Sequence, residues 1–191
     1  MAGSSTADVG QAAFYFDLAS PEAYLAAEQV NQTLDHVPEW IPVLASGLPA
    51  AERFDAWRCR EDELAYRDGV ERRAAAAGLQ PVRWPEPFPF DSAFAMRVAW
   101  YAKSIGRAVA FAHAAFRQAY AAGRALDVQD NVLIAASACE MHPAAVLRGA
   151  QLRSVDEGLR AATALAAQRG VRDVPAVWLQ GGRVLHGMVT A

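Results

Sequence analysis

The stretch that decides the fold is AAFYFDLASPEAYLA, residues 12–26. Its first half is short, apolar and aromatic, which predicts a buried strand over residues 12–19. Ser20 then stands where a helix N-cap is expected, Pro21 suits the first helical position, and the pattern continues as a helix to residue 34. The sequence therefore predicts a strand that turns directly into a helix, with a hydroxyl at the junction.

Strand and helix patterns follow one another in a clear order along the rest of the chain. PEWIPVLA, residues 38–45, predicts a second strand. From about residue 50 to 168 alanine-rich amphipathic helices take over, and the last of them opens with Ser154 and Glu157 at capping-box spacing. DVPAVWLQGGRVLHG, residues 173–187, predicts a β-hairpin that turns at Gly181-Gly182.

This order predicts an α/β protein with a thioredoxin-like fold and an inserted all-helical domain. We expect residues 10–48 and 169–191 to form the split thioredoxin-like domain and residues 49–168 to form the helical insertion. The thioredoxin-like fold normally ends with a helix packed on the sheet. No helical pattern follows the hairpin, so that final helix is expected to be absent from this sequence.

Composition narrows the class of protein. The chain has 191 residues, of which 53% are hydrophobic and 20% charged, as in globular proteins. A net charge of −3 offers no basic surface for nucleic acid, and no apolar run approaches the ~18 residues of a membrane span. The first residues lack the features of a secretory signal, and Cys59 and Cys139 share no Cys-x-x-Cys spacing. We expect a cytoplasmic protein with reduced cysteines.

The junction at Ser20 is the first candidate site. Thioredoxin-like proteins carry a Cys-x-x-Cys pair where the first strand meets the first helix, because the helix N-terminus stabilises a thiolate there. In this chain the two positions are Ser20 and Ala23, so dithiol–disulfide exchange is excluded and thiol chemistry needs an outside thiol. Ser20 as a helix cap and nothing more remains the alternative interpretation.

Val174-Pro175 is the second candidate. In this fold a cis-proline often opens the strand that faces the first helix, and the residue before it pairs its backbone with a peptide-like ligand. The position and character of RDVPAVW, residues 172–178, fit that role. Pro175 can also be a simple strand start.

The proline-rich connection LQPVRWPEPFPFDS, residues 79–92, supplies further candidates. Its aromatic side chains either line a substrate pocket or pack in the core, and the sequence does not separate the two. Asp91 and Ser92 are better explained as helix caps than as ligands. The four histidines have no metal-ligand spacing, so no metal site is predicted.

Four segments together resemble the 2-hydroxychromene-2-carboxylate isomerases, a family related to kappa-class glutathione transferases and to DsbA-like disulfide oxidoreductases. They are FYFDLASPEAYLAAEQV, WPEPFPFDSAFAMRVAW, AFAHAAFRQAYAAGRALDVQD and RGVRDVPAVWLQGGRVLHG, which lie in order between residues 14 and 187. The resemblance rests on their combination and spacing and not on any single motif.

The resemblance implies a glutathione-dependent isomerase of hydroxychromene carboxylates in aromatic catabolism. It implies that Ser20 hydrogen-bonds the glutathione sulfur and that Val174 and Pro175 hold the cysteinyl part. A homodimer is a further expectation. The residues expected near an aromatic carboxylate substrate are Trp84, Phe90, Asp91 and Ser92.

Three alternatives stay open on the sequence. Another low-molecular-weight thiol can take the place of glutathione. A kappa-like glutathione transferase fits the same resemblance. A catalytically silent thioredoxin-fold binding protein is favoured by Gly187-Met188-Val189, because family members commonly have a Gly-Gln-Asp-type turn there that holds the glutamyl end.

Overall fold

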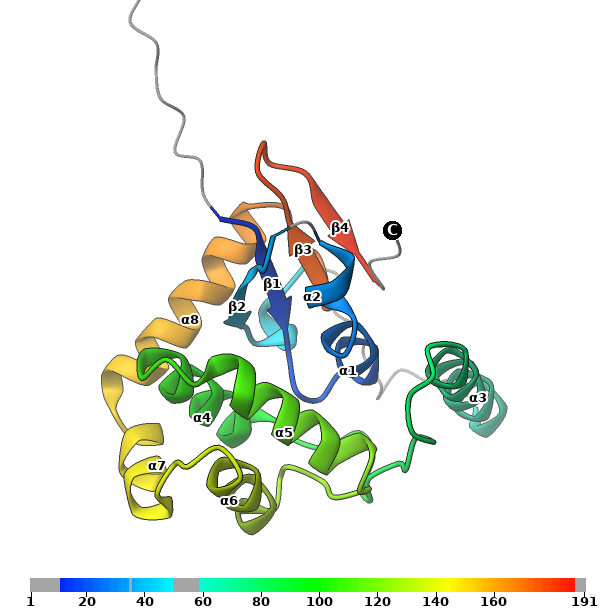
Figure 1. Ribbon diagram of the computed structural model, residues 1–191, viewed down its shortest axis with the longest axis horizontal. Coiled ribbons are helices and arrows are strands. Elements are labelled where there is room, and N and C mark those ends of the chain that lie inside the picture. The colour runs from blue at the N-terminus through cyan, green and yellow to red at the C-terminus, as the bar shows by residue number, and fades with distance from the viewer. Residues whose placement is uncertain (1–10, 35, 50–58, 188–191) are drawn as a thin grey trace, which may run out of the picture.

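The computed structural model describes residues 11–34, 36–49 and 59–187. Four strands form one sheet, and most of the helices lie between the second and third strands in the sequence (Figure 1). The elements are β1 (Ala13–Phe16), α1 (Pro21–Ala27), α2 (Val30–Thr33), β2 (Glu39–Pro42), the short 3₁₀ helix η1 (Ala45–Gly47), α3 (Arg60–Ala76), α4 (Ala93–Ser104), α5 (Ala108–Tyr120), α6 (Gln129–Ser137), α7 (Pro143–Ala150), α8 (Arg153–Gln168), β3 (Ala176–Trp178) and β4 (Val184–His186).

The sheet has the strand order β2-β1-β3-β4. β1 and β2 are parallel, with Phe14 opposite Trp40, and α1 and α2 make the crossover between them. β3 runs antiparallel to both β1 and β4, and Phe14 pairs with Val177 across the sheet. The predicted β-hairpin is therefore confirmed, and Gly181 and Gly182 adopt positive φ angles in its turn.

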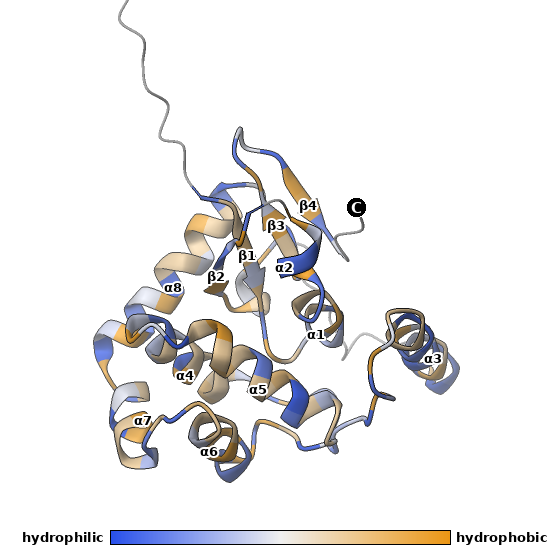
Figure 2. Ribbon diagram, viewed as in Figure 1, coloured by the Kyte–Doolittle hydropathy of each residue, from blue (hydrophilic) through white to orange (hydrophobic). Residues whose placement is uncertain are grey.

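Helices cover both faces of the sheet because successive side chains of β1 point to opposite sides. Phe14 and Phe16 face a core shared with α1, α4 and α5, whereas Ala13 and Tyr15 face a second core shared with α8. All four side chains are at most 1% exposed. Figure 2 shows the apolar character of these strands between the helices.

The α/β thioredoxin-like fold with a helical insertion is confirmed: α3 to α8 separate the β1-α1-β2 half of the sheet from the β3-β4 half. The division of the chain at residues 48 and 168 stays a prediction. β4 is the last element within the described ranges, and residues 188 and 189 of the Gly-Met-Val turn lie outside them. Among the described helices, none combines the length and apolar composition needed to cross a membrane.

Two local predictions were wrong. The helix expected to continue to residue 34 is interrupted, because Gln29 N–H bonds Ala26 C=O three residues back, which tightens and ends α1. The capping box at Ser154 does not form either. The N-cap of α8 is Leu152, two residues before Ser154, and the Glu157 carboxylate accepts from Arg153 at 2.6 Å instead.

Candidate functional site

Ser20 joins β1 to α1 as its sequence position predicts. Its Oγ accepts a hydrogen bond from Ala23 N–H at 3.1 Å, so the N-cap is confirmed, and Pro21 is the first helical residue. Ser20 is only 6% exposed. A serine hydroxyl can accept and donate at the same time. Among the described residues, no acceptor for the Ser20 proton is found.

The charge nearest in sequence to Ser20 is that of Glu22. Burial raises the pKa of this carboxyl above its ordinary value, against the opposing effect of Arg73 on α3, which pairs with it. A free carboxylate beside Ser20 would repel an anionic ligand. The Arg73 guanidinium reduces that repulsion, so an anion at Ser20 is better tolerated than the sequence alone suggests.

Val174-Pro175 is a cis peptide bond that directly precedes β3. Because Tyr15 pairs with Ala176 in the antiparallel ladder, the start of β3 lies at the same end of the sheet as the end of β1. The second candidate site therefore lies near the β1–α1 junction. Val174 N–H is already engaged, however: it donates to the Asp173 carboxylate at 2.7 Å.

Asp17, which sequence reasoning did not single out, is a buried carboxylate three residues before Ser20 and only 4% exposed. Its oxygens accept from Ala19 N–H at 2.9 Å, from Ala45 N–H at 2.9 Å and from the Ser92 hydroxyl at 2.8 Å. Burial raises the pKa of Asp17, and the three donors oppose that rise. Asp17 thus connects β1, the segment after β2 and the start of α4.

The two polar candidates of the proline-rich connection have separate structural roles. The Asp91 carboxylate accepts from Ala93 N–H at 2.8 Å and acts as a cap for α4. Ser92 makes no capping bond, because its hydroxyl donates to Asp17. Ser92 is still the N-cap residue of α4 by position, so the cap interpretation is confirmed for Asp91 by its side-chain bond and for Ser92 by position alone.

The aromatic candidates divide between core and cavity. Trp84 packs edge-on against Phe88, with ring centroids 4.8 Å apart, and its indole N–H donates to Glu71 at 2.7 Å. Phe90 is 6% exposed and lies 6.3 Å from the ring of Tyr120. Neither Trp84 nor Phe90 lines the cavity found beside this connection, whereas Phe88 does.

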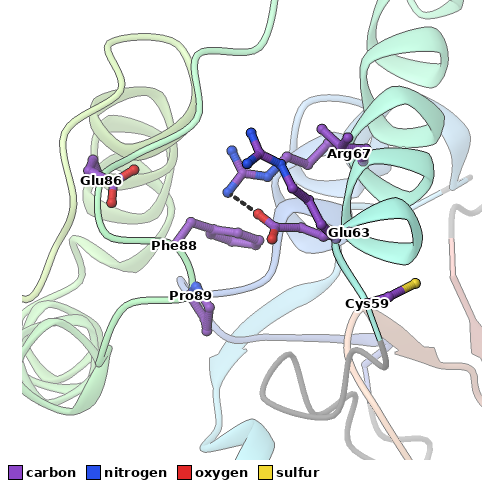
Figure 3. A pocket seen from close by; sticks show the side chains of 8 residues that line it. Cys59, Glu63, Arg67, Glu86, Phe88 and Pro89 are labelled. Carbon is purple, nitrogen blue, oxygen red and sulfur yellow. Dashed lines mark ion pairs between the residues drawn. The ribbon is translucent and has the colours of Figure 1, made fainter.

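That cavity has a volume of about 740 Å³ and lies between the N-terminal half of α3 and the proline-rich connection (Figure 3). Arg67 pairs with Glu63 at 2.6 Å, and its guanidinium lies 5.4 Å from the Phe88 ring centroid. An aromatic surface beside cationic groups suits a ligand that carries both an apolar ring and a negative charge. The lining residues are Cys59, Arg60, Glu63, Leu64, Arg67, Glu86, Phe88 and Pro89.

Among the described residues, the histidines and cysteines form no metal site. The His113 ring packs at a tilt against Trp40, with ring centroids 4.9 Å apart, and His142 caps α7 by accepting from Ala144 N–H at 3.2 Å. Both cysteines are free thiols. Within the part of the chain that the structure describes, no group of three or more His, Cys, Asp or Glu side chains could hold a metal ion.

A match to a family model shows the protein family to which this chain belongs. The model of the DsbA-like thioredoxin domain matches residues 11–190, which is nearly the whole chain. The chain belongs to the DsbA-like thioredoxin domain family. In this DsbA-like protein Ser20 and Ala23 lie at the β1–α1 junction with the spacing of a Cys-x-x-Cys pair, and neither side chain can form a disulfide.

Solved structures agree on the DsbA-like fold. A 2-hydroxychromene-2-carboxylate isomerase aligns with a TM-score of 0.77 and 21% identity, over 92% of this chain and 88% of its own. A probable DsbA oxidoreductase from Streptomyces coelicolor aligns with a TM-score of 0.73 and 21% identity, over 93% and 83%. The cytosolic disulfide reductase DsbM from Pseudomonas aeruginosa, solved with GSH, gives 0.62 and 16%, over 91% and 87%. A search of curated proteins finds no match.

Proposed function

We propose that this protein is a glutathione-dependent isomerase of 2-hydroxychromene-2-carboxylate or similar aromatic-derived acids. The observation that carries the proposal is the Ser20 hydroxyl, which accepts from Ala23 N–H and has no acceptor for its own proton among the described residues. Its place at the β1–α1 junction is the one that the redox motif of this fold is expected to occupy, with Ser20 at the first cysteine position. A hydroxyl at that place can hold a sulfur without forming a disulfide, which suits a reaction that uses a borrowed thiol and returns it.

Bound glutathione would supply a thiolate whose sulfur adds to the substrate's conjugated double bond, moving its electron pair onto the conjugated oxygen, and which leaves after rotation about the resulting single bond. The role of Ser20 is to donate its proton in a hydrogen bond to the sulfur and so favour the thiolate over the thiol. Lowering a thiol pKa by one unit takes about 1.4 kcal/mol. One hydrogen bond to a charged group supplies that much.

The cavity beside α3 is the proposed place for the aromatic acid. Phe88 offers a ring surface, and Arg67 and Arg60 offer cationic groups for a carboxylate. Arg67 is already shared with Glu63, so the substrate carboxylate would compete for it or use Arg60. Trp84 packs edge-on against Phe88 and so supports this wall without lining the cavity.

Two of the similar structures support the choice of reaction and thiol. One is a 2-hydroxychromene-2-carboxylate isomerase, and another is a disulfide reductase solved with GSH. Both are distant in sequence, at 21% and 16% identity, so their similarity to this chain shows a shared fold and nothing finer.

A second candidate, a binding protein of the same fold without the chemistry, is favoured by one contact. Val174 N–H is the group that would pair with the cysteinyl part of glutathione, and Asp173 occupies it at 2.7 Å. Glutathione can pair there only after the Asp173 carboxylate has moved aside. If that carboxylate stays in place, the site binds glutathione weakly or takes a smaller thiol.

The test is an isomerisation assay with 2-hydroxychromene-2-carboxylate, followed by absorbance, with glutathione far below the substrate concentration. We expect many turnovers per glutathione and a loss of about tenfold or more in kcat/KM for Ser20→Ala. Ser104→Ala is the matched control, because that exposed hydroxyl only bonds Tyr101 C=O. Accumulation of a glutathione conjugate would indicate a transferase, and activity unchanged in Ser20→Ala would refute the role of the hydroxyl.

A further inference from the structure

The Ser20 loop receives a hydrogen bond from deep inside the helical insertion. Tyr120, at the end of α5, is fully buried, and its hydroxyl donates to Ala19 C=O at 2.6 Å, with Leu18 C=O further away at 3.5 Å. More than a hundred residues separate the two partners in sequence. A buried phenol without a partner would be costly, so this bond explains why a tyrosine is tolerated there.

Every peptide group of the loop from Asp17 to Ser20 makes a hydrogen bond, two of them through N–H groups that donate to side chains. Leu18 N–H lies 3.2 Å from the Met96 sulfur on α4, and Ala19 N–H donates to the Asp17 carboxylate at 2.9 Å. Ser20 N–H donates to Asp17 C=O at 3.1 Å. The loop is neither strand nor helix, and side chains therefore satisfy backbone groups that secondary structure leaves unpaired.

The Tyr120 hydroxyl bonds the peptide unit that directly precedes the Ser20 Cα. Ala19 C=O and Ser20 N–H belong to one planar group. One end of this group is fixed by Tyr120 and the other by Asp17 C=O. The plane fixes the positions of Ser20 N and Cα, the Ser20 φ angle of −90° then directs Cβ, and the bond from Ala23 N–H orients Oγ.

We propose that Tyr120 is a positioning residue: its hydroxyl fixes the Ala19–Ser20 peptide and thereby aims the Ser20 hydroxyl. Its catalytic consequence rests on the proposed function, whereas its effect on the loop does not. Burial raises the pKa of Tyr120 well above its ordinary value near 10, so the phenol remains a donor at physiological pH. The helical insertion thus contributes to the site without touching the ligand.

A purely structural role for Tyr120 is the competing explanation. Its ring stacks on Tyr24 at 5.6 Å and meets Phe90 at 6.3 Å, which are ordinary core contacts. Tyr120→Phe keeps the ring and removes only the oxygen, so it separates the two roles. Tyr24→Phe is the matched control, because it removes the hydroxyl of the stacked neighbour, which has no bond to Ala19.

The experiment measures amide hydrogen exchange of Ser20 by NMR in the ligand-free wild type, Tyr120→Phe and Tyr24→Phe. We expect Ser20 exchange to accelerate about tenfold in Tyr120→Phe, relative to the β1 amides, and to stay within twofold in Tyr24→Phe. Normalising to the β1 amides removes any change in global stability. Equal Ser20 exchange in the two variants would overturn the proposal.

Isomerase kinetics give the second readout. In Tyr120→Phe we expect kcat to fall about tenfold while KM for glutathione changes less than twofold, because a misdirected hydroxyl affects the reaction more than binding. A faster-exchanging Ser20 with unchanged kcat would refute the catalytic consequence. If the wild type shows no isomerase activity at all, the proposed function fails, and the exchange data still decide whether Tyr120 positions the loop.

Discussion

Glu28 provides a quantitative test of how the helical insertion is attached to the sheet half. It caps the C-terminus of α1, and both of its oxygens accept from Arg117 on α5, each at 2.7 Å. Burial favours the neutral acid, but His113 and Arg117 outweigh it and lower the pKa of Glu28 from 4.5 to about 2. His113 Nδ1 lies 3.8 Å away, too far for a hydrogen bond, so Arg117 has the larger effect.

The perturbation is Glu28→Gln. A fall in pKa from 4.5 to about 2 corresponds to at most roughly 3–4 kcal/mol. The Arg117 side chain is 60% exposed, so water screens the pair, and we expect a loss of about 1–2 kcal/mol in the free energy of unfolding at pH 7. In a chain of 191 residues that lowers Tm by about 2–8 °C.

The pH dependence distinguishes this effect from a general disturbance. Because the folded-state pKa is depressed, the stabilisation is complete above pH 4.5 and is lost as the pH falls towards 2. The difference between wild type and Glu28→Gln, measured by urea unfolding, should therefore shrink over that range. Glu157→Gln is the control, because its Arg153 partner is 90% exposed and the pair should contribute less than about 0.5 kcal/mol. Equal losses in both variants would refute the reasoning.

The remaining predictions concern stability and are measured by urea or thermal unfolding. Gly149→Ala should cost about 1–3 kcal/mol, because a Cβ there would lie 2.4 Å from the Tyr101 ring. Gly69→Ala, in α3 with its nearest neighbour at 3.4 Å, should be neutral or gain up to about 1 kcal/mol; a loss as large as that of Gly149→Ala would contradict the packing argument. Asp17→Asn should lower the free energy of unfolding by about 1–3 kcal/mol, because an amide NH2 in place of the carboxylate oxygen would face Ala45 N–H, donor against donor. Burial raises the pKa of Asp17, so its charge costs stability as the pH rises through that pKa, and Asp17→Asn should abolish this dependence.

The sequence was most informative where local chemistry determines structure. Ser20-Pro21 predicted the start of α1, and Gly181-Gly182 predicted the turn of the β3–β4 hairpin, where both glycines adopt positive φ angles. These signals depend on one residue's own conformational preference. The order of strands and helices was sufficient to predict the thioredoxin-like fold with its insertion.

Contacts between distant segments could not be predicted in the same way. Tyr120 looks like an ordinary part of an alanine-rich helix, and only folding brings its hydroxyl to the Ser20 loop. Asp17 belongs to that loop, but only folding brings Ala45 and Ser92 to its carboxylate. The Ser154–Glu157 spacing was a misleading local signal, since Arg153 offered the glutamate an alternative partner. The cis isomer of Val174-Pro175 also depends on the surrounding fold and not on the dipeptide alone.

The central claim, that Ser20 holds the thiolate of a borrowed thiol, is tested most directly by calorimetric titration of reduced glutathione. Wild type and Ser20→Ala are titrated from pH 6 to 9 in buffers of different ionisation enthalpy, which reports the protons released. The account predicts saturable binding with release of about one proton near neutral pH, and a loss of that release in Ser20→Ala. No binding at millimolar glutathione, or the same proton release in both proteins, would contradict it.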